Sequence, residues 1–201
     1  MPSIYDLKPR FQALLRPVVG ALAAAGVTAN QVTVGAALLS VVTGALITAW
    51  PGAARVLLLV PLVLFLRMAL NAIDGMLARE HQQQSRLGAV LNELGDVVSD
   101  SALYLPLALV PGLEPRLVVL AVVVAIIGEM TGVVAIQVGA ARRYDGPMGK
   151  SDRAFWFGLL TLLLGLGLTP GWWCTALLAA IAGLGIVTIV NRARRALGST
   201  A

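Results

Sequence analysis

Residues 54–78 read ARVLLLVPLVLFLRMALNAIDGMLA. The first part of this stretch is almost wholly apolar, and the whole is long enough to form a helix across a bilayer core, which takes roughly 20 residues. Five further apolar stretches lie at 31–49, 88–110, 116–140, 154–169 and 172–191, separated by Pro and Gly residues typical of turns. The sequence therefore predicts an all-α membrane protein with six transmembrane helices.

The composition agrees with a protein that the bilayer solvates. Of the 201 residues, 58% are hydrophobic and only 12% are charged, whereas a soluble domain carries roughly 25% charged residues. A single cysteine, Cys174, excludes an intrachain disulfide and a cysteine-based zinc site. No repeat or composition break divides the chain, so we expect one membrane domain over residues 1–201.

The N-terminal segment differs from the predicted spans. Apolar residues recur there at helical spacing, and basic residues lie between them. The apolar set is Ile4, Leu7, Phe11, Leu14, Leu15 and Val18, and the basic set is Lys8, Arg10 and Arg16. This pattern predicts an amphipathic helix over residues 1–18 that lies on the membrane surface.

The basic residues predict the orientation of the spans. With the N-terminus inside, 12 of the 15 Lys and Arg residues lie in cytoplasmic segments, Arg55 and Arg116 lie on the opposite side, and Arg67 lies within a span. The positive-inside rule then places both termini in the cytoplasm. We interpret the net charge of +5 as topology and contact with anionic lipid, with no nucleic-acid partner.

Five of the ten acidic residues fall inside predicted spans, where lipid makes a charge costly and a functional role is the first hypothesis. They are Asp74, Glu93, Asp96, Asp100 and Glu129. Asn71, Asp74, Gly75 and Ala78 share one helix face, as do Gly88, Asn92, Asp96 and Asp100. The short polar loop 80–86 brings these faces together in a pocket at the cytoplasmic end. Its oxygen ligands suit Mg²⁺ or Mn²⁺.

The stretch from Asn71 to Asp96 resembles the acidic motif of the CDP-alcohol phosphotransferases. That motif reads Asp, two residues, Asp-Gly, two residues, Ala-Arg, eight residues, Gly, three residues, Asp, three residues, Asp. Every spacing is matched here, with identity at Asp74, Gly75, Ala78, Arg79, Gly88 and Asp96. The family's fold, six membrane helices after an N-terminal surface helix, is similar to the layout above.

Two positions depart from the motif, because Asn71 and Asn92 replace its first and third acids. Asparagine offers a carbonyl oxygen to a metal but no charge. We therefore expect weaker divalent binding and one firm metal site where the family implies two.

The resemblance implies that an alcohol oxygen attacks the β-phosphorus of a CDP-linked lipid, CDP-diacylglycerol, and releases CMP in phospholipid biosynthesis. The enzyme would work at the cytoplasmic face of a bacterial inner membrane, as a homodimer in many family members. Asp74, Asn71 and Asn92 would hold metal, and Asp96 would act as general base and also touch metal. Arg79 would contact the diphosphate, and Gly75, Ala78 and Gly88 would leave room for the nucleotide. Thr28, Asn30 and Thr33 match a family stretch near the nucleotide, with capping of the first span as the alternative.

Charged residues outside the motif have two interpretations each. Arg142, Arg143, Lys150 and Ser151 would bind an anionic acceptor, or supply positive-inside charge and a helix cap. Glu129 would contact substrate or form an interhelical hydrogen bond. We expect Arg67 to pair with a buried acid, and Arg192, Arg194 and Arg195 to anchor the chain to anionic lipid.

Two rival functions remain. The first is a catalytically silent relative that binds CDP-lipid or scaffolds a membrane complex, which Asn71 and Asn92 would favour. The second is a small transporter, which would place polar residues at the bilayer midplane rather than toward one face.

Overall fold

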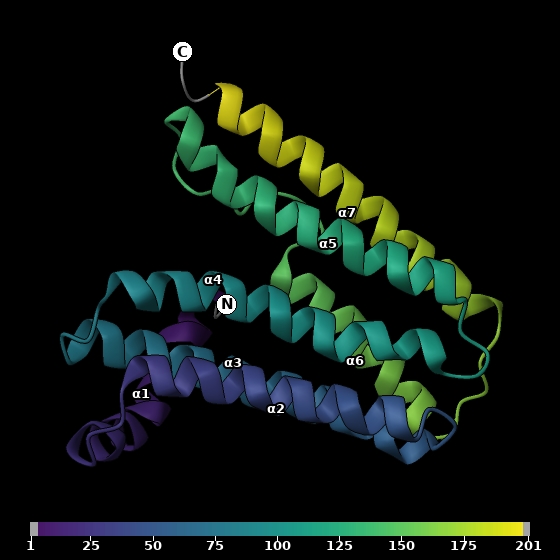
Figure 1. Ribbon diagram of the computed structural model, residues 1–201, viewed down its shortest axis with the longest axis horizontal. Coiled ribbons are helices and arrows are strands. Elements are labelled where there is room, and N and C mark those ends of the chain that lie inside the picture. Colours follow the sequence, from purple (N-terminus) through teal and green to yellow (C-terminus); the bar gives the residue numbers. More distant parts are fainter. Residues whose placement is uncertain (1–3, 199–201) are drawn as a thin grey trace. The chain divides into compact units, whose positions relative to one another are not determined.

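The described residues form helices joined by turns and by one longer segment, residues 139–149 (Figure 1). The computed structural model describes residues 4–198, and side chains from residue 11 onward. The helices are α1 (Ile4–Ala24), α2 (Ala29–Ala49), α3 (Leu59–Glu80), α4 (Arg86–Tyr104), α5 (Pro115–Val134), α6 (Lys150–Gly165) and α7 (Trp172–Gly198), with 3-10 turns η1 (Ala54–Leu58), η2 (Leu105–Leu109) and η3 (Ala135–Val138). The described residues contain no strand, which confirms the all-α prediction.

Four segments of the described chain are long and apolar enough to cross a membrane. They cover Ala29–Ala49, Ala54–Glu80, Pro115–Val138 and Trp172–Gly198. The other two predicted spans, 88–110 and 154–169, overlap α4 and α6. Helix α4 contains an arginine and three acids, and α6 has only 16 residues, so neither has the length and composition of an ordinary span.

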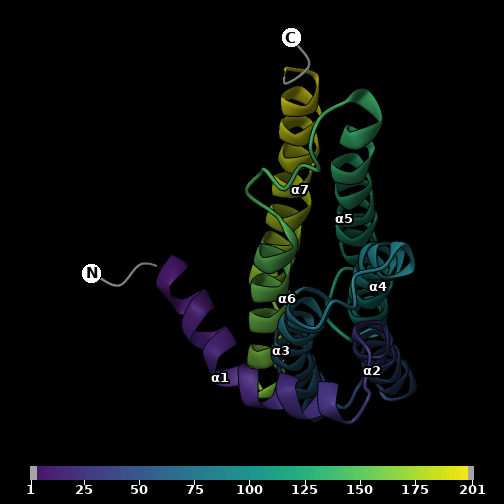
Figure 2. The ribbon, with the colours of Figure 1, turned by 90° about the vertical axis from the view of Figure 1, so that its left-hand side faces the viewer.

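The described residues form two compact units, which we treat separately. The first takes in residues up to Val41 together with Val63–Ser99. Its core contains Val19 from α1, Val32 from α2, and Met76 and Leu77 from α3. Figure 2 shows α1 running across α2 and α3 rather than alongside them.

Residues 4–18 of the predicted surface helix form the first part of α1, which continues to Ala24. Leu14 is 74% exposed and Val18 is 47% exposed, while Val19, rotated about 100° from Val18 around the helix, is fully buried. Of the predicted pattern, residues 1–3 and the side chains of residues 4–10, including Lys8 and Arg10, lie outside the described part of the chain.

The second unit takes in Val42–Leu62 and the described residues from Asp100 onward. Helices α5 and α7 lie side by side in both views (Figures 1 and 2). The segment between η3 and α6 folds back onto this pair. The amide of Met148 donates to Thr188 Oγ1 over 2.9 Å. Gly146 has φ +122°, and a Cβ there would lie 2.6 Å from Thr188, so glycine is needed for this close approach.

Candidate active site

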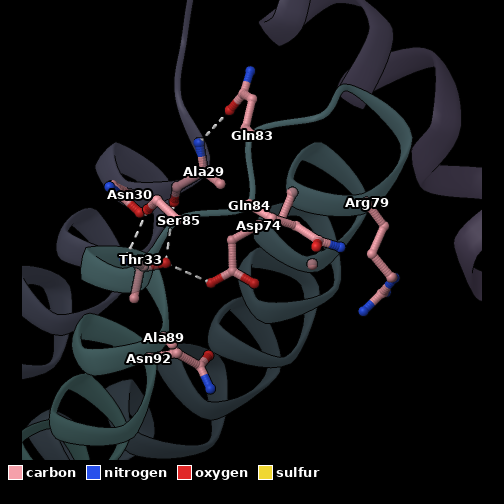
Figure 3. Close-up of a pocket in the computed structure, with 13 residues that line it drawn as sticks. Ala29, Asn30, Thr33, Asp74, Arg79, Gln83, Gln84, Ser85, Ala89 and Asn92 are labelled. Carbon is pink, nitrogen blue, oxygen red and sulfur yellow. Dashed lines mark hydrogen bonds between the residues drawn. The ribbon is translucent and has the colours of Figure 1, made fainter.

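A cavity of about 380 Å³ lies within the first unit (Figure 3). Its volume is within the range of small-molecule sites, roughly 300–1,000 Å³. The start of α2, the end of α3, the loop 81–85 and the start of α4 form its walls. The lining residues are Ala29, Asn30, Thr33, Asp74, Gly75, Ala78, Arg79, Gln83, Gln84, Ser85, Gly88, Ala89 and Asn92.

Side-chain caps fix the two helix N-termini at the rim of the cavity. Thr28 Oγ1 accepts from the amide of Gln31 over 3.2 Å, and Gln31 Oε1 accepts from the amide of Thr28 over 2.9 Å, which is a capping box. Ser85 Oγ accepts from the amide of Gly88 over 2.9 Å and caps α4. The capping interpretation of Thr28 is confirmed. Two helix N-termini at one cavity favour an anionic ligand.

The loop 81–85 is held to the turn between α1 and α2. Helix α3 ends with Gln82 at φ +54° and the amide of Gln83 donating to the carbonyl of Ala78 over 3.1 Å, a Schellman arrangement. The Gln83 side chain then accepts from the amide of Ala29 over 2.7 Å and donates to the carbonyl of Val27 over 3.4 Å. One glutamine therefore ties this wall of the cavity to the start of α2.

Asp74 is the buried carboxylate of the cavity, with 6% of its surface exposed. Thr33 Oγ1 donates to Asp74 Oδ2 over 2.8 Å, and the Ala29 carbonyl oxygen lies 3.1 Å from the same hydroxyl (Figure 3). Asn92 lines the cavity from α4. The structure therefore places a carboxylate and a carboxamide from the predicted ligand set in one cavity.

The motif glycines make room beside polar groups. A Cβ at Gly75 would lie 3.1 Å from Arg79 Nη2, so the guanidinium rests against the glycine backbone. A Cβ at Gly88 would lie 2.8 Å from Asn30 Oδ1 and 3.0 Å from Ser85 Oγ. Any larger residue at position 88 would therefore displace Asn30 or the cap of α4.

Two members of the predicted ligand set, Asn71 and Asp96, do not line the cavity. Asp96 lies 3.8 Å from Arg67 Nη2 as an ion pair, and the Arg67 side chain is only 4% exposed. The prediction that Arg67 pairs with an acid is confirmed, but this acid is on α4 and its side chain is 23% exposed rather than buried. Among the residues that the structure describes, no three His, Cys, Asp or Glu side chains cluster closely enough to hold a metal ion.

Glu129 and Asp100 are the acids of a separate cluster in the second unit. Arg153 Nη2 lies 3.0 Å from Glu129 Oε1 and 3.1 Å from Asp100 Oδ2. Glu129 Oε2 lies 3.2 Å from Arg142 and 3.4 Å from Arg192. The interhelical hydrogen bond predicted as one interpretation of Glu129 is confirmed, because Arg153 belongs to α6.

Arg192 is not a lipid anchor, and that prediction is wrong. It is 1% exposed, and it donates to the carbonyl oxygens of Gly128 and Asp145. Arg195 pairs with Asp145 over 2.6 Å. The reason is that the last turns of α7 pack against α5 and the segment before α6, so Arg192 meets carbonyl oxygens instead of headgroups. Arg194 and Arg195 are exposed, and their contact with anionic lipid stays a prediction.

The predicted acceptor-binding residues belong to the second unit, and two of them pair with acids there. Arg142 contacts Glu129, and Arg143 Nε lies 2.7 Å from Asp145 Oδ2. Lys150 and Ser151 begin α6. The helix cap weighed for this segment is present, because Asp152 Oδ2 accepts from the amide of Gly149 over 2.9 Å.

The model of the family described as CDP-alcohol phosphatidyltransferase matches residues 26–191. The chain belongs to this family. Its assignment from the acidic motif is confirmed, and as a CDP-alcohol phosphatidyltransferase it is a membrane-embedded transferase of phospholipid biosynthesis. The chain is 47% identical over 199 residues to the inner membrane protein YnbA of Escherichia coli strain K12, covering 97% of this chain and 96% of that protein.

Solved structures of a Mycobacterium tuberculosis protein are similar in fold to this phosphatidyltransferase. The phosphatidylinositol phosphate synthase PgsA1 with CDP-DAG bound has a TM-score of 0.77 at 20% identity, over 90% of this chain and 92% of that chain. The same synthase with manganese and citrate has a TM-score of 0.76 at 21% identity, over 90% and 88%.

Proposed function

We propose that this phosphatidyltransferase moves a phosphatidyl group, or a phospho-alcohol group, from a CDP-linked donor to an alcohol and releases CMP, with CDP-diacylglycerol as the donor. The observation that carries the proposal is the cavity of the first unit, which the motif residues Asp74, Gly75, Ala78, Arg79 and Gly88 line. PgsA1, the relative of similar fold, has been solved with CDP-DAG bound.

The cavity would hold the nucleotide diphosphate of the donor. The N-termini of α2 and α4 and the Arg79 guanidinium offer positive charge to the phosphates. Gly75, Ala78 and Gly88 leave space for the cytidine, and Asn30 offers it a carboxamide. Thr28 does not line the cavity and its hydroxyl is used in the cap of α2, so in our proposal Thr28 acts by fixing the start of α2.

The oxygen ligands of the cavity fit one Mg²⁺ or Mn²⁺ ion, which the phosphates of the substrate would also bind. Magnesium usually takes one or two carboxylates, several waters and substrate phosphates, and the cavity offers the Asp74 carboxylate and the Asn92 carboxamide. These two residues would hold the ion, with Asn71 behind them on α3. The ion would neutralise charge on the diphosphate and on the departing CMP.

Asp96 would take the proton of the acceptor alcohol. As the alcohol oxygen bonds to the β-phosphorus, the bond from that phosphorus to the CMP oxygen breaks, and the hydroxyl proton moves to the Asp96 carboxylate. CMP leaves with the electron pair of the broken bond. Asp74 and Arg79 keep the diphosphate in place through this exchange.

The arginine cluster of the second unit supports an acceptor that carries an anionic group. Its ion pairs join more arginines than acids: Arg142, Arg143, Arg153, Arg192 and Arg195 against Asp100, Glu129 and Asp145. A phosphate on the acceptor would balance the surplus. Arg142, Arg143, Lys150 and Ser151 are the residues we assign to it.

In our proposal the chain is one domain with six spans, α2 to α7. Helices α4 and α6, which lack the length or composition of an ordinary span, cross the bilayer too. Helix α1 lies in the cytoplasmic interface, consistent with its crosswise course and its exposed Leu14 and Val18. Both termini and the cavity face the cytoplasm of the bacterial inner membrane. Following the family resemblance, the chain works as a homodimer.

The test is CMP release by the purified protein in detergent, with CDP-diacylglycerol, Mg²⁺ and a panel of alcohols and alcohol phosphates. We expect Asp74→Ala and Asp96→Ala each to lower kcat at least a hundredfold, the scale of a lost general base. The matched control is Glu80→Gln, an acid at the end of α3 that is 40% exposed and pairs with Arg16. Normal turnover in both alanine variants would reject the assignment.

The alternative is a catalytically silent relative that binds CDP-lipid or scaffolds a complex. Asn71 and Asn92, together with the lack of any three-acid cluster among residues 11–198, favour it. A silent relative would bind CDP with metal and release no CMP with any alcohol. CMP release with any one alcohol would exclude the silent relative.

A further inference from the structure

Arg67 is a buried arginine that the proposed reaction does not yet use. It lies inside Ala54–Glu80, one of the segments long and apolar enough to span the membrane. A cation at such a position is costly, and it persists where a partner or a function compensates it. Its guanidinium forms an ion pair with Asp96, the acid that we assign as the general base.

Helix geometry separates the site into two layers. Arg67 comes seven residues before Asp74 on α3, about 10 Å further from the loop 81–85. Asp96 comes four residues after Asn92 on α4, about 6 Å further from the same loop. Because the loop joins the two helices as antiparallel neighbours, both steps lead in the same direction. Asp74 and Asn92 form the outer layer at the cavity, and Arg67 and Asp96 form the inner layer.

The two layers differ in formal charge. The outer layer has one negative charge, on Asp74, and a neutral carboxamide, on Asn92. In the inner layer the charges of Arg67 and Asp96 cancel, and Asn71, one turn from Arg67 on the same face of α3, adds none. Glu93 does not line the cavity, and it is rotated about 100° from Asn92 around α4. A divalent cation is therefore attracted to the outer layer only.

Resting on the proposed function, we infer that Arg67 is a fixed counter-cation for Asp96 and that the site takes one divalent ion, at Asp74. Arg67 is a positioning residue, since it acts on the reaction through Asp96. Its guanidinium supplies the positive charge that a metal ion would otherwise have to supply beside that carboxylate. The pairing also accounts for Asn71, because an acid at position 71 would leave two inner-layer acids beside a single arginine.

The first test counts metal ions by electron paramagnetic resonance titration of Mn²⁺ into the full chain in detergent, with and without CDP. The wild-type chain should bind one Mn²⁺ with CDP. The double variant Arg67→Met/Asn71→Asp should bind two, because its inner layer has two acids and no cation. The matched control Asn71→Asp keeps the Arg67 guanidinium beside the Asp96 carboxylate, where a second ion would have to bind, and should stay at one. Two ions in the wild type, or one ion in a double variant that still binds CDP, would overturn the inference.

Thermal unfolding covers the case in which the double variant fails to fold. Arg67→Met leaves Asp96 without this partner, whereas Arg67→Met/Asp96→Asn removes both charges. We expect the second variant to recover at least half of the loss in Tm caused by the first, and Arg67→Lys to match the wild type. An equal or larger loss in the double variant would overturn the pairing.

The metal count also separates the two proposals. If the wild-type chain binds no Mn²⁺ in the presence of CDP, the proposed function fails and the role of Arg67 fails with it. If it binds two ions and releases CMP, the proposed function stands and only the one-ion site is overturned.

Discussion

Replacing Glu129 by Gln removes the charge at the centre of the arginine cluster while keeping the shape of the side chain. Three arginines lie within 3.4 Å of its carboxylate: Arg153 at 3.0 Å, Arg142 at 3.2 Å and Arg192 at 3.4 Å. Removing one partner of a buried ion pair costs roughly 3–5 kcal/mol, because the remaining charge is left uncompensated. We expect Glu129→Gln to lose at least this much unfolding free energy.

The measurement is thermal unfolding of the purified chain in detergent micelles. For a chain of about 200 residues, 1 kcal/mol shifts Tm by about 2–4 °C, so Glu129→Gln should lower Tm by roughly 6–20 °C. The matched control is Glu114→Gln. Glu114 precedes the same helix, is exposed, and makes no side-chain capping hydrogen bond, so its Tm should stay within about 1 °C of the wild type.

A Tm of Glu129→Gln within about 2 °C of the wild type would refute this reasoning, since the loss would then be under about 1 kcal/mol. A double-mutant cycle gives a second check. Arg153→Met combined with Glu129→Gln should cost less than the sum of the single changes, because the double variant no longer buries the Arg153 charge. Simple additivity would show that the two residues are not coupled.

Three further predictions concern single residues. Gln82→Gly should stabilise the chain by about 1 kcal/mol, because a non-glycine residue in the left-handed region costs about 1–2 kcal/mol; an unchanged Tm would contradict this. Thr33→Val should lower kcat/KM roughly 10- to 150-fold, because it removes the hydrogen bond to the charged Asp74 carboxylate. Thr33→Ser keeps a hydroxyl and should restore kcat/KM. A wild-type rate of CMP release from the valine variant would count against the role of the hydroxyl. Burial opposes ionisation of Asp145, but Arg143 and Arg195 outweigh it and hold the pKa of its carboxyl below the usual value. Since the folded pKa is the lower one, the stabilisation is present above about pH 4 and is lost as the pH falls further. Asp145→Asn should therefore reduce the fall in unfolding free energy between about pH 4 and lower pH. An unchanged pH dependence would contradict the pairing.

The all-α fold and the cavity could be predicted because both depend on local patterns. Apolar length gave the spans at 31–49, 54–78, 116–140 and 172–191, which overlap all four membrane-length segments of the structure. The spacing from Asp74 to Asn92 placed their side chains in one cavity, because helix periodicity and a short loop leave two helices few ways to meet.

Contacts distant in sequence could not be predicted in the same way. Arg192 follows an apolar helix as a lipid anchor would, and only the packing of α7 on α5 shows that it binds carbonyls of Gly128 and Asp145. Asp96 follows the motif spacing, yet it lies behind the cavity beside Arg67. The sequence signal for that pairing was the costly position of Arg67 itself, which required an acid without specifying which one.

The order in which the chain is synthesised makes Glu129 a demanding residue for insertion. The ribosome completes α5 before any of its arginine partners exist, and Arg192 is made last. At roughly 5–20 residues per second, Glu129 waits several seconds for that partner. During this interval α5 must enter the bilayer with an uncompensated acid, or stay at the translocon until α7 emerges. The segment Pro115–Val138, which contains α5, has a mean hydropathy of 2.6, the highest among the four membrane-length segments. This apolar surface favours insertion of the nascent helix while Glu129 has no partner.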